Sequence, residues 1–98
     1  MSLSVLAEAR GDILAAACWY ESRELGLGEA LVEEIDATLL RIEAGPERFP
    51  VMYRSARRAL VRRFPYAIYF LCDSADIVIL AVLHQRRDRG AINERFEE

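Results

Sequence analysis

His84 is the only histidine in this chain of 98 residues, and arginines lie on both sides of it in the sequence. It ends an apolar segment and is followed by Gln85-Arg86-Arg87-Asp88. Neighbouring positive charge favours a neutral imidazole, the form that acts as a general base near pH 7. The alternative is a histidine at a strand end that hydrogen-bonds to the backbone. Metal-free acid–base catalysis needs a second positioned group, so both interpretations stay open.

Three pairs of arginines lie on or near the apolar segments that precede and include His84. If they converge, they form charge-assisted forks with phosphate, an RNA backbone or an acidic peptide. If Arg62 and Arg63 are on a strand, they point to opposite faces, and only one of them joins any single site. A solvated basic surface is the alternative. The six residues are Arg57, Arg58, Arg62, Arg63, Arg86 and Arg87.

The net charge of −3 conceals a division of the chain into an acidic and a basic half. Through Glu47 there are three arginines and ten acidic residues, whereas from Arg48 to Arg95 there are ten arginines and four acidic residues. None of the 13 cationic residues is a lysine. Arginine is well suited to bidentate contact with carboxylate or phosphate, so the basic half indicates an anionic partner.

The sequence contains no pattern that indicates a metal or a cofactor. Cys18 and Cys72 lie far apart without a CxxC motif, which predicts buried, reduced thiols and no zinc site. A glycine-rich phosphate loop and a Ser-His-Asp arrangement are also missing. Met1 to Leu6 lacks the basic and apolar regions of an export signal, and no run of about 20 apolar residues indicates a membrane span. We expect a cytoplasmic protein with no cofactor and no membrane contact.

Two helices are predicted in the first half of the chain. Apolar residues recur at steps of three and four from Ala7 to about Leu25, and again from Gly28 to Ala44. Glycines between the two segments permit a short turn, and Gly45-Pro46 ends the second helix. The short connection predicts an antiparallel helical hairpin. Ser2 to Leu6 is expected to add a short strand in front of it.

The second half is predicted to form a three-stranded antiparallel meander. Arg58 to Phe64, Tyr66 to Asp73 and Asp76 to His84 are rich in β-branched and aromatic residues, and Ser74-Ala75 fits a tight turn. Pro65 indicates a turn or an edge position, because proline has no N–H for a strand ladder. The element order predicts one α+β domain over residues 1–98, with both helices on one face of the sheet.

The segment Ile77 to Leu83 is apolar throughout and lacks the alternation of a half-exposed strand. Two helices cover only one face of a sheet, so the second apolar face is expected to bind a partner. The alternative is that segment 46–56 and the residues after Asp88 cover this face.

Five short motifs lie in a fixed order along the chain. They are Glu8-Ala9-x-x-Asp12-Ile13, Trp19-Tyr20-Glu21, Gly45-Pro46-x-x-Phe49-Pro50, Arg63-Phe64-Pro65-Tyr66-x-Ile68-Tyr69-Phe70 and Val82-Leu83-His84-x-Arg86-Arg87-Asp88. Their order, spacing and total length resemble the RelE/ParE toxin superfamily, the plasmid-stabilisation toxins of type II toxin–antitoxin systems. The resemblance covers about the whole chain and implies a compact α+β toxin.

The resemblance implies one of two targets. RelE-like members cleave mRNA in the ribosome with basic residues on the sheet and a late Tyr or His, whereas ParE-like members inhibit DNA gyrase. Here His84 stands near the late catalytic position and Arg62 or Arg63 at that of a sheet arginine, but no tyrosine follows Tyr69 and lysine is absent. The sequence therefore favours a ParE-like toxin that acts without catalysis. A ribosome-dependent endoribonuclease that uses His84, Arg62 and Arg63 is the alternative, and a non-toxic family member is a second.

The resemblance also implies a cognate antitoxin, whose flexible acidic or amphipathic segment docks on the toxin. We expect the apolar sheet face to bind this antitoxin and the arginine rim to bind the target, either gyrase or ribosome-bound mRNA. No direct sequence-specific DNA binding is expected. The predicted antitoxin contacts are Tyr69, Val78, Leu80 and Val82, and the predicted target contacts are Arg57, Arg58, Arg86 and Arg87.

Overall fold

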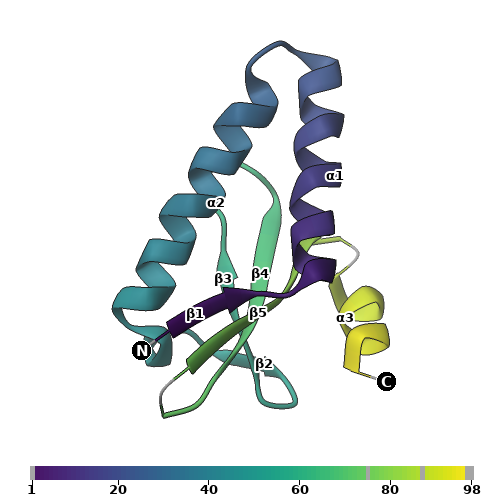
Figure 1. Ribbon diagram of the computed structural model, residues 1–98. Coiled ribbons are helices and arrows are strands. Elements are labelled where there is room, and N and C mark those ends of the chain that lie inside the picture. Colours follow the sequence, from purple (N-terminus) through teal and green to yellow (C-terminus); the bar gives the residue numbers. More distant parts are fainter. Residues whose placement is uncertain (1, 75, 87, 97–98) are drawn as a thin grey trace.

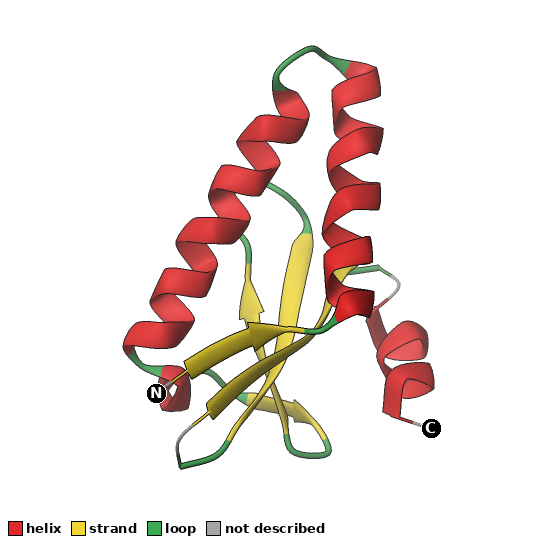
Figure 2. Ribbon diagram, viewed as in Figure 1, coloured by secondary structure: helices red, strands yellow, loops and turns green. Residues whose placement is uncertain are grey.

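The computed structural model describes residues 2–74, 76–86 and 88–96, which form an α+β fold (Figure 1). A helical hairpin lies across one face of a five-stranded sheet, and a short C-terminal helix lies at the side of the sheet (Figure 2). The elements are β1 (Ser2–Val5), α1 (Ala7–Arg23), α2 (Leu27–Ala44), the 3-10 turn η1 (Pro46–Arg48), β2 (Val51–Tyr53), β3 (Ala56–Leu60), β4 (Tyr66–Cys72), β5 (Asp76–His84) and α3 (Asp88–Phe96).

The fold confirms the predicted strand–helix–helix–meander order and adds η1, β2 and α3 to it. The strand order is β1-β5-β4-β3-β2, in which β1 runs parallel to β5 and the other neighbours are antiparallel. Strand β2 and helix α3 were not predicted. The turn expected at Ser74-Ala75 lies partly outside the described residues, and the flanking Asp73 and Asp76 are joined by a backbone hydrogen bond of 3.0 Å.

The turn between α1 and α2 is held by one carboxylate. Glu21 accepts hydrogen bonds from the backbone N–H of Gly26 at 2.8 Å and of Gly28 at 2.9 Å. These bonds stabilise the ionised form and lower the pKa of Glu21 below its usual value. Gly26 has a φ of 90°, which a glycine adopts without strain. At Gly28 a Cβ atom would lie 2.4 Å from the carbonyl oxygen of Ala17, so the two helices approach closely only because this residue is glycine.

The main core lies between the helical hairpin and the sheet. Leu31, Ile35 and Ile42 of α2 are buried there against the strands. Thr38, on the same side of α2, satisfies its buried hydroxyl by donating to the carbonyl of Glu34 at 2.8 Å. The strand residues of this core include Ala59, Ile68, Phe70, Ile77, Ile79 and Val82.

A β-bulge in β5 decides which side chains reach the second face of the sheet. Tyr69 lies opposite Ala81, whereas its neighbour Phe70 lies opposite Ile79, so Leu80 has no partner of its own in β4. After this extra residue the alternation is reversed, and Val82 joins the core beneath the helices. Val82 was predicted to contact the antitoxin on the open face; it lies instead on the opposite face and is 2 % exposed.

Helix α3 covers the part of the second face near the end of β5. Ile92 is 2 % exposed and packs with Ala67, Tyr69, Ala81 and Leu83 in a smaller apolar cluster. Half-buried residues at its border include Tyr53, whose hydroxyl donates to the side-chain oxygen of Asn93 in α3. The second face is therefore apolar, as predicted, and residues after Asp88 cover the part of it around Ile92.

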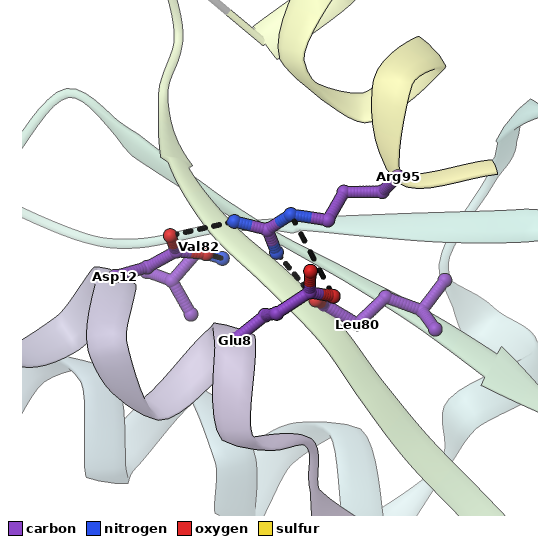
Figure 3. Close-up of polar contacts among 5 residues, drawn as sticks. All are labelled: Glu8, Asp12, Leu80, Val82 and Arg95. Carbon is purple, nitrogen blue, oxygen red and sulfur yellow. Dashed lines mark hydrogen bonds and ion pairs between the residues drawn. The ribbon is translucent and has the colours of Figure 1, made fainter. Parts of the chain in front are cut away.

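One arginine fixes α3 to the edge of the sheet (Figure 3). The guanidinium of Arg95 donates to the Asp12 carboxylate at 2.8 Å and to the carbonyl of Leu80 at 2.8 Å, and it lies 4.0 Å from Glu8. The second oxygen of Asp12 accepts the backbone N–H of Val82 at 2.9 Å. Strand β1 pairs with β5 only as far as Ile79. Side chains from α1 and α3 therefore satisfy the backbone of β5 beyond the end of β1.

Candidate functional site

The end of the sheet that carries His84 brings two turns together. Strand β3 ends at Leu60, earlier than predicted, and residues 62–65 form the turn to β4. The N–H of Gln85 donates to the carbonyl of Pro65 at 2.9 Å, which joins this turn to the end of β5. The expected turn at Pro65 is thus confirmed. The expectation that Arg62 and Arg63 alternate on a strand is wrong, because the strand has ended before them.

His84 lies half-buried beside Tyr66, its partner in the strand register. The two ring centroids are 5.3 Å apart at an angle of 71°. The Nδ1 atom of His84 accepts the backbone N–H of Arg86 at 3.1 Å. Because this nitrogen is occupied by the chain's own backbone, any proton exchange with a substrate falls to Nε2.

The arginines at this end of the sheet are exposed to solvent. Arg63 has a φ of 72°, and its side chain is 61 % exposed and 3.9 Å from Glu34 of α2. An exposed ion pair at this distance contributes at most about 1 kcal/mol. Arg62 and Arg86 are also exposed. The structure therefore gathers Arg62, Arg63 and Arg86 near His84, whereas Arg87 lies outside the described residues.

Arg57 and Arg58 lie elsewhere on the sheet and on opposite faces of it. Arg57 is opposite Phe70 of the main core, and its guanidinium donates to the carbonyls of Phe49 at 2.6 Å and Glu47 at 3.4 Å. It holds the segment that leads into β2. Arg58 is opposite Tyr69 and therefore on the second face. Of the arginines predicted to bind the target, Arg57 and Arg58 therefore do not share one surface.

A row of aromatic rings connects the helical hairpin to His84. The rings of Trp19 and Tyr20 are 4.9 Å apart, and Tyr20 lies 5.1 Å from Phe64 and 6.2 Å from Tyr66. Trp19 is 51 % exposed, and Arg23 stacks on its ring at 4.5 Å. Sequence reasoning used Trp19 only as part of a motif. The available signal was the adjacent Trp-Tyr pair on α1 with an arginine four residues after the tryptophan.

Two surfaces combine apolar groups that a protein partner could contact. On the second face of the sheet, Val78 and Leu80 are half-buried, whereas Tyr69 is 3 % exposed and therefore offers little contact area. A groove also runs between α1 and α2, with Leu14, which is 66 % exposed, at its rim. The groove is lined by Arg10, Ile13, Leu14, Ala17, Cys18, Glu21, Gly28, Glu29 and Val32.

Neither cysteine is fully buried, contrary to the sequence prediction: Cys18 is exposed and Cys72 is half-buried. Within the described ranges, no three His, Cys, Asp or Glu side chains are grouped so that they could hold a metal ion. In the same part of the chain, none of the helices has the length and apolar character needed to cross a lipid bilayer.

A profile of the ParE toxin of the type II toxin–antitoxin system parDE matches residues 3–89 of the chain. The chain belongs to the ParE toxin family. A solved structure of the chromosomal ParDE toxin–antitoxin system from P. aeruginosa is similar to it, with a TM-score of 0.78 and 18 % sequence identity. The alignment covers 86 % of this chain and 95 % of the other. A search of curated proteins gave no significant match.

The profile match extends from the first strand to the start of α3, so it includes the helical hairpin, the sheet and the turn with His84. This ParE toxin retains the whole sheet-and-hairpin architecture. The predicted RelE/ParE resemblance, on its ParE-like side, is confirmed.

Proposed function

We propose that this ParE-family toxin arrests growth by binding DNA gyrase and that a cognate antitoxin neutralises it in the cytoplasm. The observation that carries the proposal is the family match over residues 3–89, together with an architecture complete from β1 to α3. The mode of action is binding and not catalysis. Supporting this, the Nδ1 atom of His84 accepts the backbone N–H of Arg86, and the sequence lacks both lysine and a tyrosine after Tyr69.

Induced expression with and without the protein encoded beside it tests this function. Expression alone should stop growth and change the superhelical density of a reporter plasmid, and co-expression of the neighbour should restore both. Messenger RNA ends mapped in the same cells should not change. Unchanged plasmid topology with new cuts in translated mRNA would contradict the proposal, and unimpaired growth would indicate a non-toxic family member.

A ribosome-dependent endoribonuclease is the second candidate, because His84 and two of the arginines do share one end of the sheet. The hydrogen bond from Gln85 to Pro65 holds the turn with Arg62 and Arg63 next to the strand end with His84. The variant His84→Ala separates the two functions. It should remain toxic and keep its effect on DNA topology if the chain is a gyrase inhibitor, whereas a nuclease should lose its cleavage.

The proposed antitoxin contacts lie on the two exposed apolar surfaces. Val78 and Leu80 are half-buried on the second face beside α3, and Leu14 is the most exposed large apolar residue of the groove between α1 and α2. An antitoxin with one helix in the groove and an extended segment beside β5 would bury both. Tyr69 and Val82 contribute to the packing beneath these surfaces.

Single charged substitutions test the antitoxin surfaces. Val78→Asp and Leu14→Asp should each weaken antitoxin binding about tenfold or more in calorimetry, because a buried contact becomes an unpaired charge. Leu40→Asp is the matched control, since Leu40 is 67 % exposed on α2 and does not line the groove. If Val78→Asp lowers stability as much as it lowers binding, Val78 belongs to the core and not to the interface.

A further inference from the structure

The end of the sheet near His84 carries a surface that includes none of the proposed antitoxin contacts Val78, Leu80 and Leu14. It combines an exposed tryptophan with exposed cations from three separate segments: α1, the β3–β4 turn and the end of β5. We refer to it as the aromatic–arginine patch, composed of Trp19, Arg23, Arg62, Arg63, His84 and Arg86.

Ring contacts and the hydrogen bond between the two turns connect the segments that carry the patch. Arg23 stacks on Trp19 at 4.5 Å, and Trp19 contacts Tyr20, which contacts Phe64 at 5.1 Å. The guanidinium of Arg63 lies over the Phe64 ring at 5.5 Å. On the other side, Tyr20 is 6.2 Å from Tyr66, against which His84 packs.

We propose that the aromatic–arginine patch binds single-stranded nucleic acid without strong sequence preference. Exposed aromatic rings stack on bases, and arginines beside them follow the phosphate backbone, a combination typical of single-strand binding. The indole of Trp19 is half-exposed and offers ring surface to a base, while Arg62, Arg63 and Arg86 lie in the adjoining turns. A duplex keeps its bases stacked on one another, so the exposed indole selects for single strands.

The arginines alone would suit either single-stranded nucleic acid or an acidic protein segment. The Trp19 ring beside them favours nucleic acid. Within the described residues, Glu34 is the acidic side chain paired with a patch arginine, and the separation is 3.9 Å. An anionic peptide would satisfy the arginines but would not use the exposed part of the Trp19 ring. A nucleotide strand supplies both a planar base and a phosphate.

The tryptophan of the patch reports binding directly, because it is the only one in the chain. Titration of the toxin with dT20 and with rU20, in the absence of gyrase and antitoxin, should quench its fluorescence. If three phosphates are contacted, the affinity should fall about twentyfold between roughly 50 and 200 mM salt. Binding of either oligonucleotide supports the proposal, and the one that binds more tightly identifies the preferred ligand as DNA or RNA. Blunt duplex DNA should bind more weakly.

Variants distinguish the patch from general charge attraction, with labelled dT20 followed by fluorescence anisotropy. Trp19→Leu should weaken binding about tenfold. The triple variant Arg62→Gln, Arg63→Gln and Arg86→Gln should weaken it at least about tenfold and flatten the salt dependence. Arg54→Gln is the control for charge, because Arg54 is an exposed arginine in the β2–β3 turn, away from the patch. It should change affinity less than about twofold.

Three results would overturn the proposal. The first is an oligonucleotide affinity that Trp19→Leu leaves unchanged. The second is an equal loss in Arg54→Gln and in the triple variant, which would indicate diffuse charge attraction. The third is quenching of Trp19 by polyglutamate but not by oligonucleotides, which would assign the patch to an acidic protein segment. Because gyrase is not in the assay, none of these results depends on the gyrase proposal.

Discussion

Loss of the Asp12 carboxylate is expected to destabilise this toxin, because the Arg95 guanidinium and the backbone N–H of Val82 then lose a hydrogen-bond acceptor. Asp12 accepts from Arg95 at 2.8 Å and from the N–H of Val82 at 2.9 Å, and the side chains of Asp12 and Arg95 are 15 % and 20 % exposed. Hydrogen bonds to charged groups contribute about 1.5–3 kcal/mol each, and solvent access reduces the value here. Asp12→Ala should therefore lower the free energy of unfolding by about 3 kcal/mol.

Thermal unfolding followed by circular dichroism measures this effect. For a domain of this size, about 3 kcal/mol corresponds to a melting temperature roughly 12–24 °C lower. The control Asp36→Ala removes an exposed carboxylate on α2 and should change stability by less than about 0.5 kcal/mol. The double variant with Arg95→Met should be less destabilised than the sum of the single variants by about 1 kcal/mol or more. Additivity within about 0.5 kcal/mol would refute the link between α1 and α3.

Two further predictions concern the tip of the helical hairpin. Gly28→Ala should destabilise by about 1–3 kcal/mol in urea unfolding, because its Cβ would lie 2.4 Å from the Ala17 carbonyl oxygen. A Cβ at Gly11 would meet no atom within 4 Å, so Gly11→Ala should instead raise the free energy of unfolding by up to about 1 kcal/mol. If Gly11→Ala were less stable than Gly28→Ala, the close approach of α1 and α2 at Gly28 would be contradicted. Glu21 has a lowered pKa when folded, so its contribution should be present above its unfolded pKa of about 4.5 and be lost as the pH falls through the folded value. The free energy of unfolding of Glu21→Gln should fall furthest below that of the parent at neutral pH, and this difference should become smaller at acid pH. A difference that does not change with pH would exclude ionisation of Glu21 as the cause.

The elements that the sequence predicts well are those with strong local signals. The helical hairpin follows from apolar residues at helical spacing, and Gly45-Pro46 marks the end of its second helix. The two long strands Tyr66–Cys72 and Asp76–His84 agree with prediction to within a residue, because β-branched and aromatic residues fill both.

The elements that escape sequence reasoning depend on contacts between distant residues. Helix α3 is polar, and it is anchored by Ile92, which packs on β4 and β5, and by Arg95, which binds Asp12 of α1. The bulge at Leu80 cannot be read from a segment that is apolar at every position, and it alone moves Val82 to the opposite face. The arrangement at the His84 end of the sheet also depends on a contact between distant residues. Arg62, Arg63, Arg86 and His84 lie near one another, but their proximity rests on the hydrogen bond from Gln85 to Pro65.

Supercoiling by purified DNA gyrase tests the central claim most directly. Relaxed plasmid, gyrase and ATP are incubated with increasing amounts of the folded toxin, and topoisomers are separated on agarose gels. The proposed function predicts loss of supercoiling that depends on toxin concentration, is reversed by the antitoxin and is retained by His84→Ala. Full supercoiling activity at saturating amounts of folded toxin would contradict it.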